Sequence, residues 1–169
     1  HQPPPGGAPP HGRFSNLFNC SPVQLLIGWF IYGTSGHKKK PGGLVIENFK
    51  NRGDDTNILH KAVINPRFAI ELGHTHSFRM AGNTVDENFE IIDLSKSVAL
   101  PKNKIRINHY HTKSVEEYEK KIPKGDAVFG QGLNRFTDEH FAIHDRNEIY
   151  DNIMDRYIEA VKQKLRSGN

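Results

Sequence analysis

The sequence has almost no cysteine and no long hydrophobic run, and each shortage excludes a class of protein. Cys20 is the single cysteine in 169 residues, so an intrachain disulfide framework and a zinc site made only of cysteines are excluded. The longest apolar run, Leu25–Tyr32, is much shorter than the ~18–20 residues that a membrane-spanning helix needs. We therefore expect a soluble globular protein of about one domain.

Several catalytic motifs are also missing. There is no G-x-S-x-G motif, and Cys20 lies in a low-complexity stretch, so nothing supports acyl transfer through a nucleophile. There is no G-x-x-x-x-G-K-[ST] loop and no Asp-x-Asp. The 23 basic and 19 acidic residues give a net charge of +4, which suits an anionic ligand, and we expect no nucleic-acid partner.

The first residues differ in composition from the rest of the chain. The chain begins with His1, and its first twelve residues contain five Pro and three Gly. They lack the basic and apolar regions of a signal peptide. We expect residues 1–22 to be a disordered linker or a misread end of a longer gene, and residues 23–169 to form the folded part.

Hydrophobic patterning predicts an α/β fold. The run 25–32 is continuous, partly β-branched or aromatic, and followed by glycines, which is typical of a strand buried on both faces. Residues 44–49 fit either a strand or a short helix. Further strands are expected at 61–64, 68–76, 89–93 and 105–111.

Two helices are expected in the carboxyl-terminal part. Ser114 and Glu117 have the spacing of a capping box, which predicts the start of a helix, and Pro123 is expected to end that helix. Residues 126–145 are expected to be mostly loop, and a last helix is expected from about 147 to 165. A stripe at every fourth position of that helix is expected to pack into the core: Ile149, Ile153, Tyr157, Val161 and Leu165.

Four of the ten histidines form two His-x-His pairs, His74/His76 and His109/His111. In a strand, both imidazoles of such a pair point to the same face and could reach one metal ion or one anionic ligand. Each pair ends an apolar-faced strand, where a crevice of an α/β sheet would lie. The alternative is that they are ordinary half-buried histidines that bond to the backbone.

The segment 33–40, Gly-Thr-Ser-Gly-His-Lys-Lys-Lys, follows the buried strand. Its small residues would let backbone amides approach a phosphate, and its lysines would add positive charge. The alternative is a solvated basic turn. Trp29 and Tyr32 fit the core better than they fit a base-stacking role.

Six segments, taken in order, resemble one enzyme family. They are the segment 29–37 with its glycine turn, the segments 43–49 and 61–66, a histidine near 74–76, the phrase at 108–114 with the Glu-Glu-aromatic step at 116–118, and the Lys-Gly step at 124–125. Over roughly residues 25–155 the chain is similar to the carboxyl half of glycosyltransferases of family 92 and of related bacterial family-2-like enzymes. The resemblance implies a partial Rossmann-like GT-A α/β/α sandwich with a mixed sheet and C-terminal helices.

The resemblance also implies a divalent metal, Mn²⁺ or Mg²⁺, that bridges the diphosphate of a nucleotide-sugar donor to the protein. His109, and either His74 or His76, are its expected ligands. Glu47, which lies beyond the glycine turn, is the candidate catalytic base. The residues expected to bind donor or acceptor are Trp29, Gly33, Ser35, Gly36, His37, Tyr110 and Lys113.

The expected function is transfer of a sugar from this donor to a glycan or surface-polysaccharide acceptor. The Asp-x-Asp that precedes the Trp29 strand in these enzymes is missing, so we expect a fragment that is inactive alone. Its expected location is the cytoplasm, peripherally at the membrane face, or on an anchor lost with the missing half. The alternatives are a non-catalytic remnant, and a metal-dependent hydrolase that uses both His-x-His pairs with a carboxylate such as Asp93.

Overall fold

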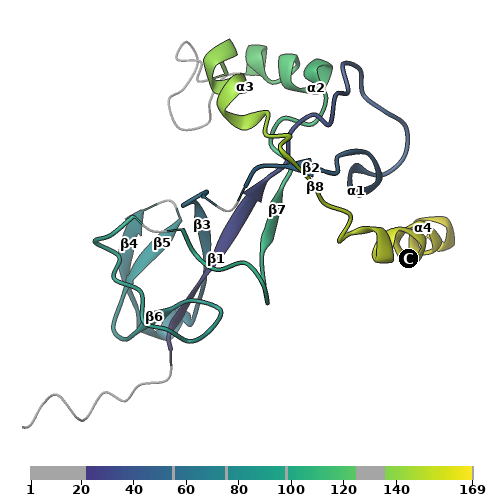
Figure 1. Cartoon of the computed structure of the whole chain (residues 1–169). Helices are drawn as coiled ribbons and strands as arrows, with labels where there is room; N and C mark the ends of the chain where they lie inside the picture. The colour runs from purple at the N-terminus through teal and green to yellow at the C-terminus, as the bar shows by residue number, and fades with distance from the viewer. Residues whose placement is uncertain (1–21, 55, 75, 98, 125–135, 169) are drawn as a thin grey trace, which may run out of the picture. The chain divides into compact units, whose positions relative to one another are not determined.

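In a computed structural model of the protein, the chain divides into two compact units (Figure 1). Unit 1 comprises the chain up to Leu26 together with Lys61–Lys96, and unit 2 comprises Ile27–His60 and the chain from Ser97 onward. The segment 1–22, expected to be disordered, lies outside the described residues except for Pro22. The structure describes residues 22–54, 56–74, 76–97, 99–124 and 136–168.

The strand β1 (Gln24–Ile31) is the expected buried strand. Seven of its eight residues are buried, and Leu25 alone is partly exposed. A continuous apolar run can be covered on both faces, which explains why this segment forms the centre of a sheet. Its first residues belong to unit 1, and the residues from Ile27 onward belong to unit 2.

The sheet built on β1 is mixed. In unit 1, β6 (Thr84–Val85) pairs in parallel with the start of β1. In unit 2, β7 (Ile107–His109) pairs in parallel with its end. The third partner, β3 (His60–Ile64), runs antiparallel, because Asn65 donates to the Val23 carbonyl and the Leu59 carbonyl accepts from Trp29. The α/β class and the strand at 61–64 are therefore confirmed.

Unit 1 also contains a hairpin of β4 (Ala69–His74) and β5 (Ser77–Met80), preceded by a 3₁₀ turn, η1 (Pro66–Phe68). The buried Gln24 fixes this hairpin to β1. Its side-chain amide donates to the Phe78 carbonyl at 3.2 Å and accepts from the Phe78 amide at 2.9 Å. A second donation, at 2.8 Å to the Thr84 hydroxyl, completes its hydrogen bonding.

Two strand predictions in unit 1 are wrong. The strand expected at 68–76 ends at His74, because the chain turns there and His74 pairs with Ser77 in the next strand. Its predicted core face is exposed, with Leu72 at 64%. The strand expected at 89–93 is reduced to a single antiparallel bridge between Ile91 and Val85, because the Asp86 carboxylate accepts the amides of Asn88 and Glu90 and closes a turn.

In unit 2 the undecided segment 44–49 forms a short helix, α1 (Val45–Asn48). The helix α2 (Val115–Glu119) has the expected capping box, in which Ser114 accepts from the Glu117 amide and the Glu117 carboxylate accepts from the Ser114 amide. It is followed by a 3₁₀ turn, η2 (Ile122–Lys124). The strand expected at 105–111 is shorter than predicted and comprises only β7 (Ile107–His109).

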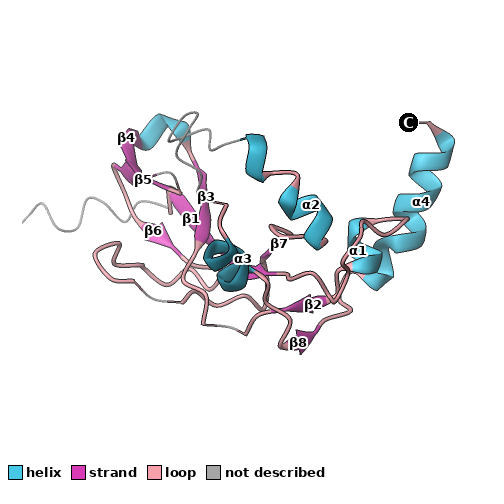
Figure 2. Cartoon of the chain, turned by 90° about the horizontal axis from the view of Figure 1, so that it is seen from above, coloured by secondary structure: helices cyan, strands magenta, loops and turns pink. Residues whose placement is uncertain are grey.

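The carboxyl-terminal part departs furthest from expectation (Figure 2). Residues 138–144, expected to be loop, form the helix α3 (Asp138–His144), which Thr137 caps. The last helix, α4 (Ile158–Ser167), begins eleven residues later than predicted. The residues before it form β8 (Ile149–Tyr150), which pairs with β2 (Asn51–Arg52), and a 3₁₀ turn, η3 (Asp155–Tyr157).

The stripe that was expected to pack into the core is exposed instead. Ile149 and Val161 are each 37% exposed and Leu165 is 67% exposed. The helical register breaks at Asp151, whose amide donates to the Lys50 carbonyl and keeps the chain extended beside β2. None of the helices in the described ranges is long and apolar enough to cross a membrane.

Candidate functional site

In unit 2, the segment that follows β1 and the segment that follows β7 lie together where these two strands end. The two strands are parallel with Ile31 opposite His109, so their carboxyl ends lie at one edge. Beyond them, the Tyr32 amide donates to the His109 carbonyl at 3.0 Å, and the Thr112 hydroxyl donates to the Tyr32 carbonyl at 3.2 Å. The first amide of α2 donates to the His37 carbonyl. The loop after β1 and the loop after β7 are thus held side by side.

The glycine turn does not offer its amides to a phosphate. Every backbone N–H from Gly33 to His37 donates to an acceptor within unit 2. The expected phosphate cradle is therefore wrong for these amides, and the turn anchors the segment before β8. The acceptors are the carbonyls of Asn51 and Arg146, the side chains of Asp145 and Asn147, and the hydroxyl and carbonyl of Thr34.

Other predicted residues of the turn also have internal contacts. A Cβ on Gly33 would lie 2.5 Å from the Arg146 carbonyl oxygen, so glycine is required there by packing. The Ser35 hydroxyl accepts from the Asn51 amide at 2.9 Å. The His37 ring contacts the Asn48 carbonyl at 3.1 Å through Nε2. Gly36 has φ +80° with open space where its Cβ would be.

Backbone strain is concentrated at this edge. Ser35 has φ 49° and Lys113 has φ 54°, which is the left-handed region that residues other than glycine rarely adopt. Phe89 in unit 1 is the third such residue in the described part of the chain. Each costs of order 1–2 kcal/mol, and such strain is common at binding and catalytic sites. Ser35 and Lys113 were both predicted substrate-binding residues.

Alternate residues of the motif after β7 point to opposite faces. On one face the His109 ring lies 4.3 Å from the Trp29 ring and 5.5 Å from the His111 ring. On the other, the Tyr110 ring lies 4.6 Å from the ring of Tyr32. Burial raises the pKa of Tyr110 to about 12 and also raises the pKa of Tyr32. Both phenols therefore remain protonated at neutral pH.

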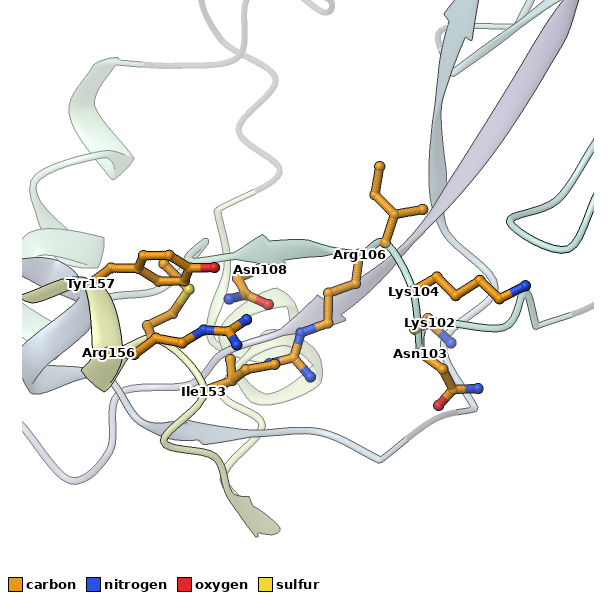
Figure 3. A pocket seen from close by; sticks show the side chains of 10 residues that line it. Lys102, Asn103, Lys104, Arg106, Asn108, Ile153, Arg156 and Tyr157 are labelled. Atoms are coloured by element: carbon orange, nitrogen blue, oxygen red, sulfur yellow. The ribbon is translucent and has the colours of Figure 1, made fainter.

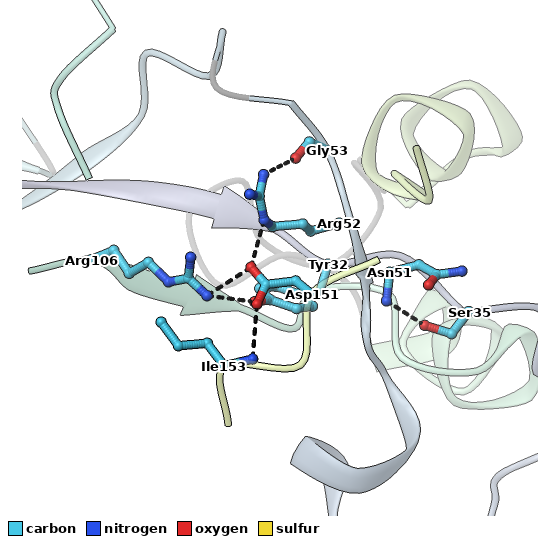
Figure 4. A network of polar contacts seen from close by, with 8 residues as sticks. All are labelled: Tyr32, Ser35, Asn51, Arg52, Gly53, Arg106, Asp151 and Ile153. Carbon is cyan, nitrogen blue, oxygen red and sulfur yellow. Dashed lines mark hydrogen bonds and ion pairs between the residues drawn. The ribbon is translucent and has the colours of Figure 1, made fainter. Parts of the chain in front are cut away.

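An ion-pair network lies beside Tyr32, whose ring packs against Tyr110 (Figure 4). One carboxylate oxygen of Asp151 accepts from Arg52 at 2.7 Å and from Arg106 at 2.8 Å. Its other oxygen accepts from the Ile153 amide at 3.0 Å. Burial alone would raise the pKa of Asp151, but these hydrogen bonds outweigh it and lower the pKa. Arg106 also donates to the Tyr32 hydroxyl at 3.1 Å.

A basic pocket of about 420 Å³ opens beside this network (Figure 3). Its lining includes four cationic side chains and no carboxylate, so its charge suits an anion. Asn108, the first residue of the family-like motif, lines it from β7. The lining residues are Lys102, Asn103, Lys104, Ile105, Arg106, Asn108, Ile153, Met154, Arg156 and Tyr157.

The predicted metal ligands fall in different units. His74 ends β4 and His76 lies in the following turn, both in unit 1, whereas His109 is in unit 2. Among the described residues, the only group of three metal-ligating side chains is His111, His140 and His144, with ligand atoms within 4.8 Å of one another. His140 and His144 were not among the predicted ligands, because their segment was expected to be loop. Their i, i+4 spacing was the available signal.

Burial lowers the pKa of His111 to about 3, with smaller contributions from the Lys121 charge and from the neighbouring histidines. Its imidazole is therefore neutral at physiological pH. A neutral imidazole keeps a lone pair on one ring nitrogen. The ring lies 5.2 Å from the His140 ring and 4.7 Å from the His144 ring.

The carboxylate of Glu47, the predicted catalytic base, is bound by two groups of unit 2. Its carboxylate forms an ion pair with Lys162 of α4 and accepts from the Leu44 amide at 2.9 Å, at the start of α1. The hydrogen bond from Lys162 and that from Leu44 lower the pKa of Glu47. A lowered pKa makes a carboxylate a weaker base, so this environment fits a helix cap better than a general base.

Comparison of the chain with protein-family models, curated proteins and solved structures finds no match.

Proposed function

We propose that the chain is the carboxyl part of a GT-A-type glycosyltransferase that takes a sugar from a nucleotide-sugar donor. One observation carries this proposal: β1 and β7 are parallel, and two of the six segments that resemble the family, 33–37 and the part of 108–114 that follows β7, lie side by side beyond their carboxyl ends. Ligands of open α/β sheets bind at that edge. The strained backbone of Ser35 and Lys113 at the same edge supports a site there.

The basic pocket supports an anionic ligand such as the diphosphate of the donor. Arg156 and Lys104 line it without a carboxylate in the lining, and its volume falls within the 300–1,000 Å³ typical of small-molecule sites. Asn108 links it to the family-like motif. Arg106 is held by Asp151, so its guanidinium is fixed in place before a ligand arrives. In this proposal the pocket holds phosphate oxygens, and a glycan or surface polysaccharide is the acceptor.

The metal implied by the family does not fit the described residues. Mn²⁺ and Mg²⁺ prefer oxygen ligands, and carboxylates usually supply them. Within the described ranges no trio of metal-ligating side chains includes His109, and the one trio that exists contains only imidazoles. We therefore derive no step through Mn²⁺ or Mg²⁺, and the proposal concerns donor binding by this chain's own residues.

The hydrolase alternative finds less support. It needs both His-x-His pairs and a carboxylate at one ion, and the one trio of potential ligands within the described ranges contains a single member of these pairs, His111, and no carboxylate. Its candidate carboxylate, Asp93, accepts from the Ser95 hydroxyl at 2.6 Å and pairs with Lys96 at 3.3 Å. These local contacts account for Asp93 as a turn residue.

Donor binding tests the proposal. The purified chain is titrated with UDP-, GDP- and dTDP-linked hexoses, and binding is followed by calorimetry and by saturation-transfer NMR. We expect one donor class to bind, and we expect Lys104→Ala with Arg156→Ala to weaken it about tenfold or more, through lost charge-assisted contacts. Lys164→Ala, which removes an exposed charge from α4, is the matched control and should leave binding unchanged. Absence of binding across the panel, or equal binding by all variants, would overturn the proposal.

A further inference from the structure

Three histidines from separate parts of unit 2 converge next to α3. His140 and His144 are four residues apart on this helix, so they lie on one face, and their rings stack at 4.0 Å. His111 joins them from the segment after β7. One ligand nitrogen from each ring lies within 4.8 Å of the others. Two histidines one helical turn apart, with a third from elsewhere, is an arrangement suited to a transition metal.

Hydrogen bonds on the outer side orient two of the rings. His144 Nδ1 lies 2.8 Å from the His140 carbonyl oxygen, and because a carbonyl only accepts, this nitrogen carries the proton. The lone pair of His144 is then on Nε2. A backbone carbonyl or similar acceptor behind each imidazole is the usual outer shell of a metal-bound histidine.

The Tyr118 hydroxyl contacts His140 Nδ1, as the His140 carbonyl contacts His144 Nδ1. Its hydroxyl lies 3.3 Å from the Thr137 carbonyl, to which it donates, and 2.8 Å from His140 Nδ1. When the hydroxyl gives its one proton to Thr137 it accepts from Nδ1, and this is the tautomer that metal binding through His140 Nε2 requires. Tyr118 is 3% exposed, which keeps this contact away from water.

The third histidine has an unsatisfied atom at this place. His111 Nε2 is buried and has no hydrogen-bond partner among the described residues. A buried polar atom without a partner is unfavourable, and such atoms often mark a missing ligand or ion. A metal ion among the three rings would satisfy it.

We propose that His111, His140 and His144 bind a transition metal, with Zn²⁺ the best fit, as a three-nitrogen site with one position left for water or another ligand. Imidazole suits Zn²⁺, and a tetrahedral ion with Zn–N bonds of about 2.0–2.1 Å needs nitrogens about 3.3 Å apart. The rings therefore close by roughly 1.5 Å from their present spacing of up to 4.8 Å. The ion would tie α3 to the segment after β7. The proposal is independent of sugar transfer.

Cobalt substitution tests the site directly. The untagged 169-residue chain is freed of metal with a chelator and titrated with Co²⁺, whose visible absorption reports four-coordinate nitrogen ligation. Zn²⁺ is then used to displace the Co²⁺. We expect one ion per chain. His140→Asn and His144→Asn should abolish the band, whereas His60→Asn, the same substitution in β3, should retain it. Tyr118→Phe should weaken binding about 10- to 100-fold.

A measurement on the wild-type chain guards against variants that fail to fold. Long-range ¹H–¹⁵N correlation spectra of the imidazoles should show His140 and His144 protonated at Nδ1, and Zn²⁺ should shift Nε2 of these two rings and of His111. The proposal is overturned if no cobalt band forms, if the band persists in His140→Asn and His144→Asn, or if Zn²⁺ leaves the three Nε2 signals unmoved. A failed donor titration with an intact cobalt band would reject sugar transfer and leave this site standing.

Discussion

Replacing Asp151 by asparagine tests how unit 2 is held together. The Asp151 side chain is 9% exposed, and those of Arg52 and Arg106 are 13% and 15% exposed. An asparagine at this position would keep the shape and could still accept from the Ile153 amide, but both guanidinium groups would lose the negative charge of Asp151. The two cations would then lie in a largely buried position without the Asp151 charge that they share.

The loss of free energy of unfolding expected in Asp151→Asn follows from the burial of the network. Removing one partner of a buried ion pair costs about 3–5 kcal/mol, because the remaining charge stays desolvated. Here Arg52 and Arg106 also lie over the Phe30 ring, at 3.8 and 4.8 Å, and both retain some contact with water. We therefore expect the lower end, about 3 kcal/mol. With an m-value of about 2 kcal/mol per molar, the urea midpoint falls by about 1.5 M.

The single tryptophan provides the assay, because Trp29 lies in unit 2 with the network. Urea unfolding is followed by its emission for the wild type, Asp151→Asn and Glu148→Gln. The last variant is the control, since Glu148 is 49% exposed and its pair with Arg146 is a surface pair worth about 0–1 kcal/mol. Equal midpoints for Asp151→Asn and Glu148→Gln would refute the reasoning.

Three other predictions concern the same unit. The pKa of Asp151 is lowered in the folded chain, so its contribution to stability is complete above the unfolded pKa of about 3.9 and is lost as pH falls through the folded pKa. Urea midpoints measured from pH 5 to pH 2 should show this loss of stability, and the loss should be smaller in Asp151→Asn. Ser114→Ala should lower the free energy of unfolding by about 1 kcal/mol through the lost cap, measured in urea, with Ser167→Ala unchanged. Gly33→Ala should destabilise by about 1–3 kcal/mol through its clash with the Arg146 carbonyl, and a thermal melt equal to wild type would contradict this.

The features that the sequence predicted correctly are local. The buried strand β1 follows from a continuous apolar run, and the capping box of α2 needs only Ser114 and Glu117 at the right spacing. Both signals act within a few residues, so tertiary contacts cannot easily override them. The parallel ends of β1 and β7 also brought the family-like segments together, as the predicted α/β fold requires.

The errors arise where distant residues decide the local structure. The helical stripe from Ile149 is broken because Asp151 bonds to Arg52 and Arg106, and neither partner is close in sequence. The amides of the glycine turn are used by Asp145 and Asn147, which lie more than 100 residues away. The three-histidine cluster depends on α3, a helix whose residues carried no apolar stripe strong enough to predict it.

We propose that the edge formed by β1 and β7 binds a nucleotide sugar. The most direct measurement is the emission of Trp29, whose ring lies 4.3 Å from that of His109, during titration with the donor panel and with correction against free tryptophan. We expect a saturable change with one donor class and its loss in the double variant Lys104→Ala/Arg156→Ala. Emission that stays constant across the panel in the folded wild-type chain would contradict it.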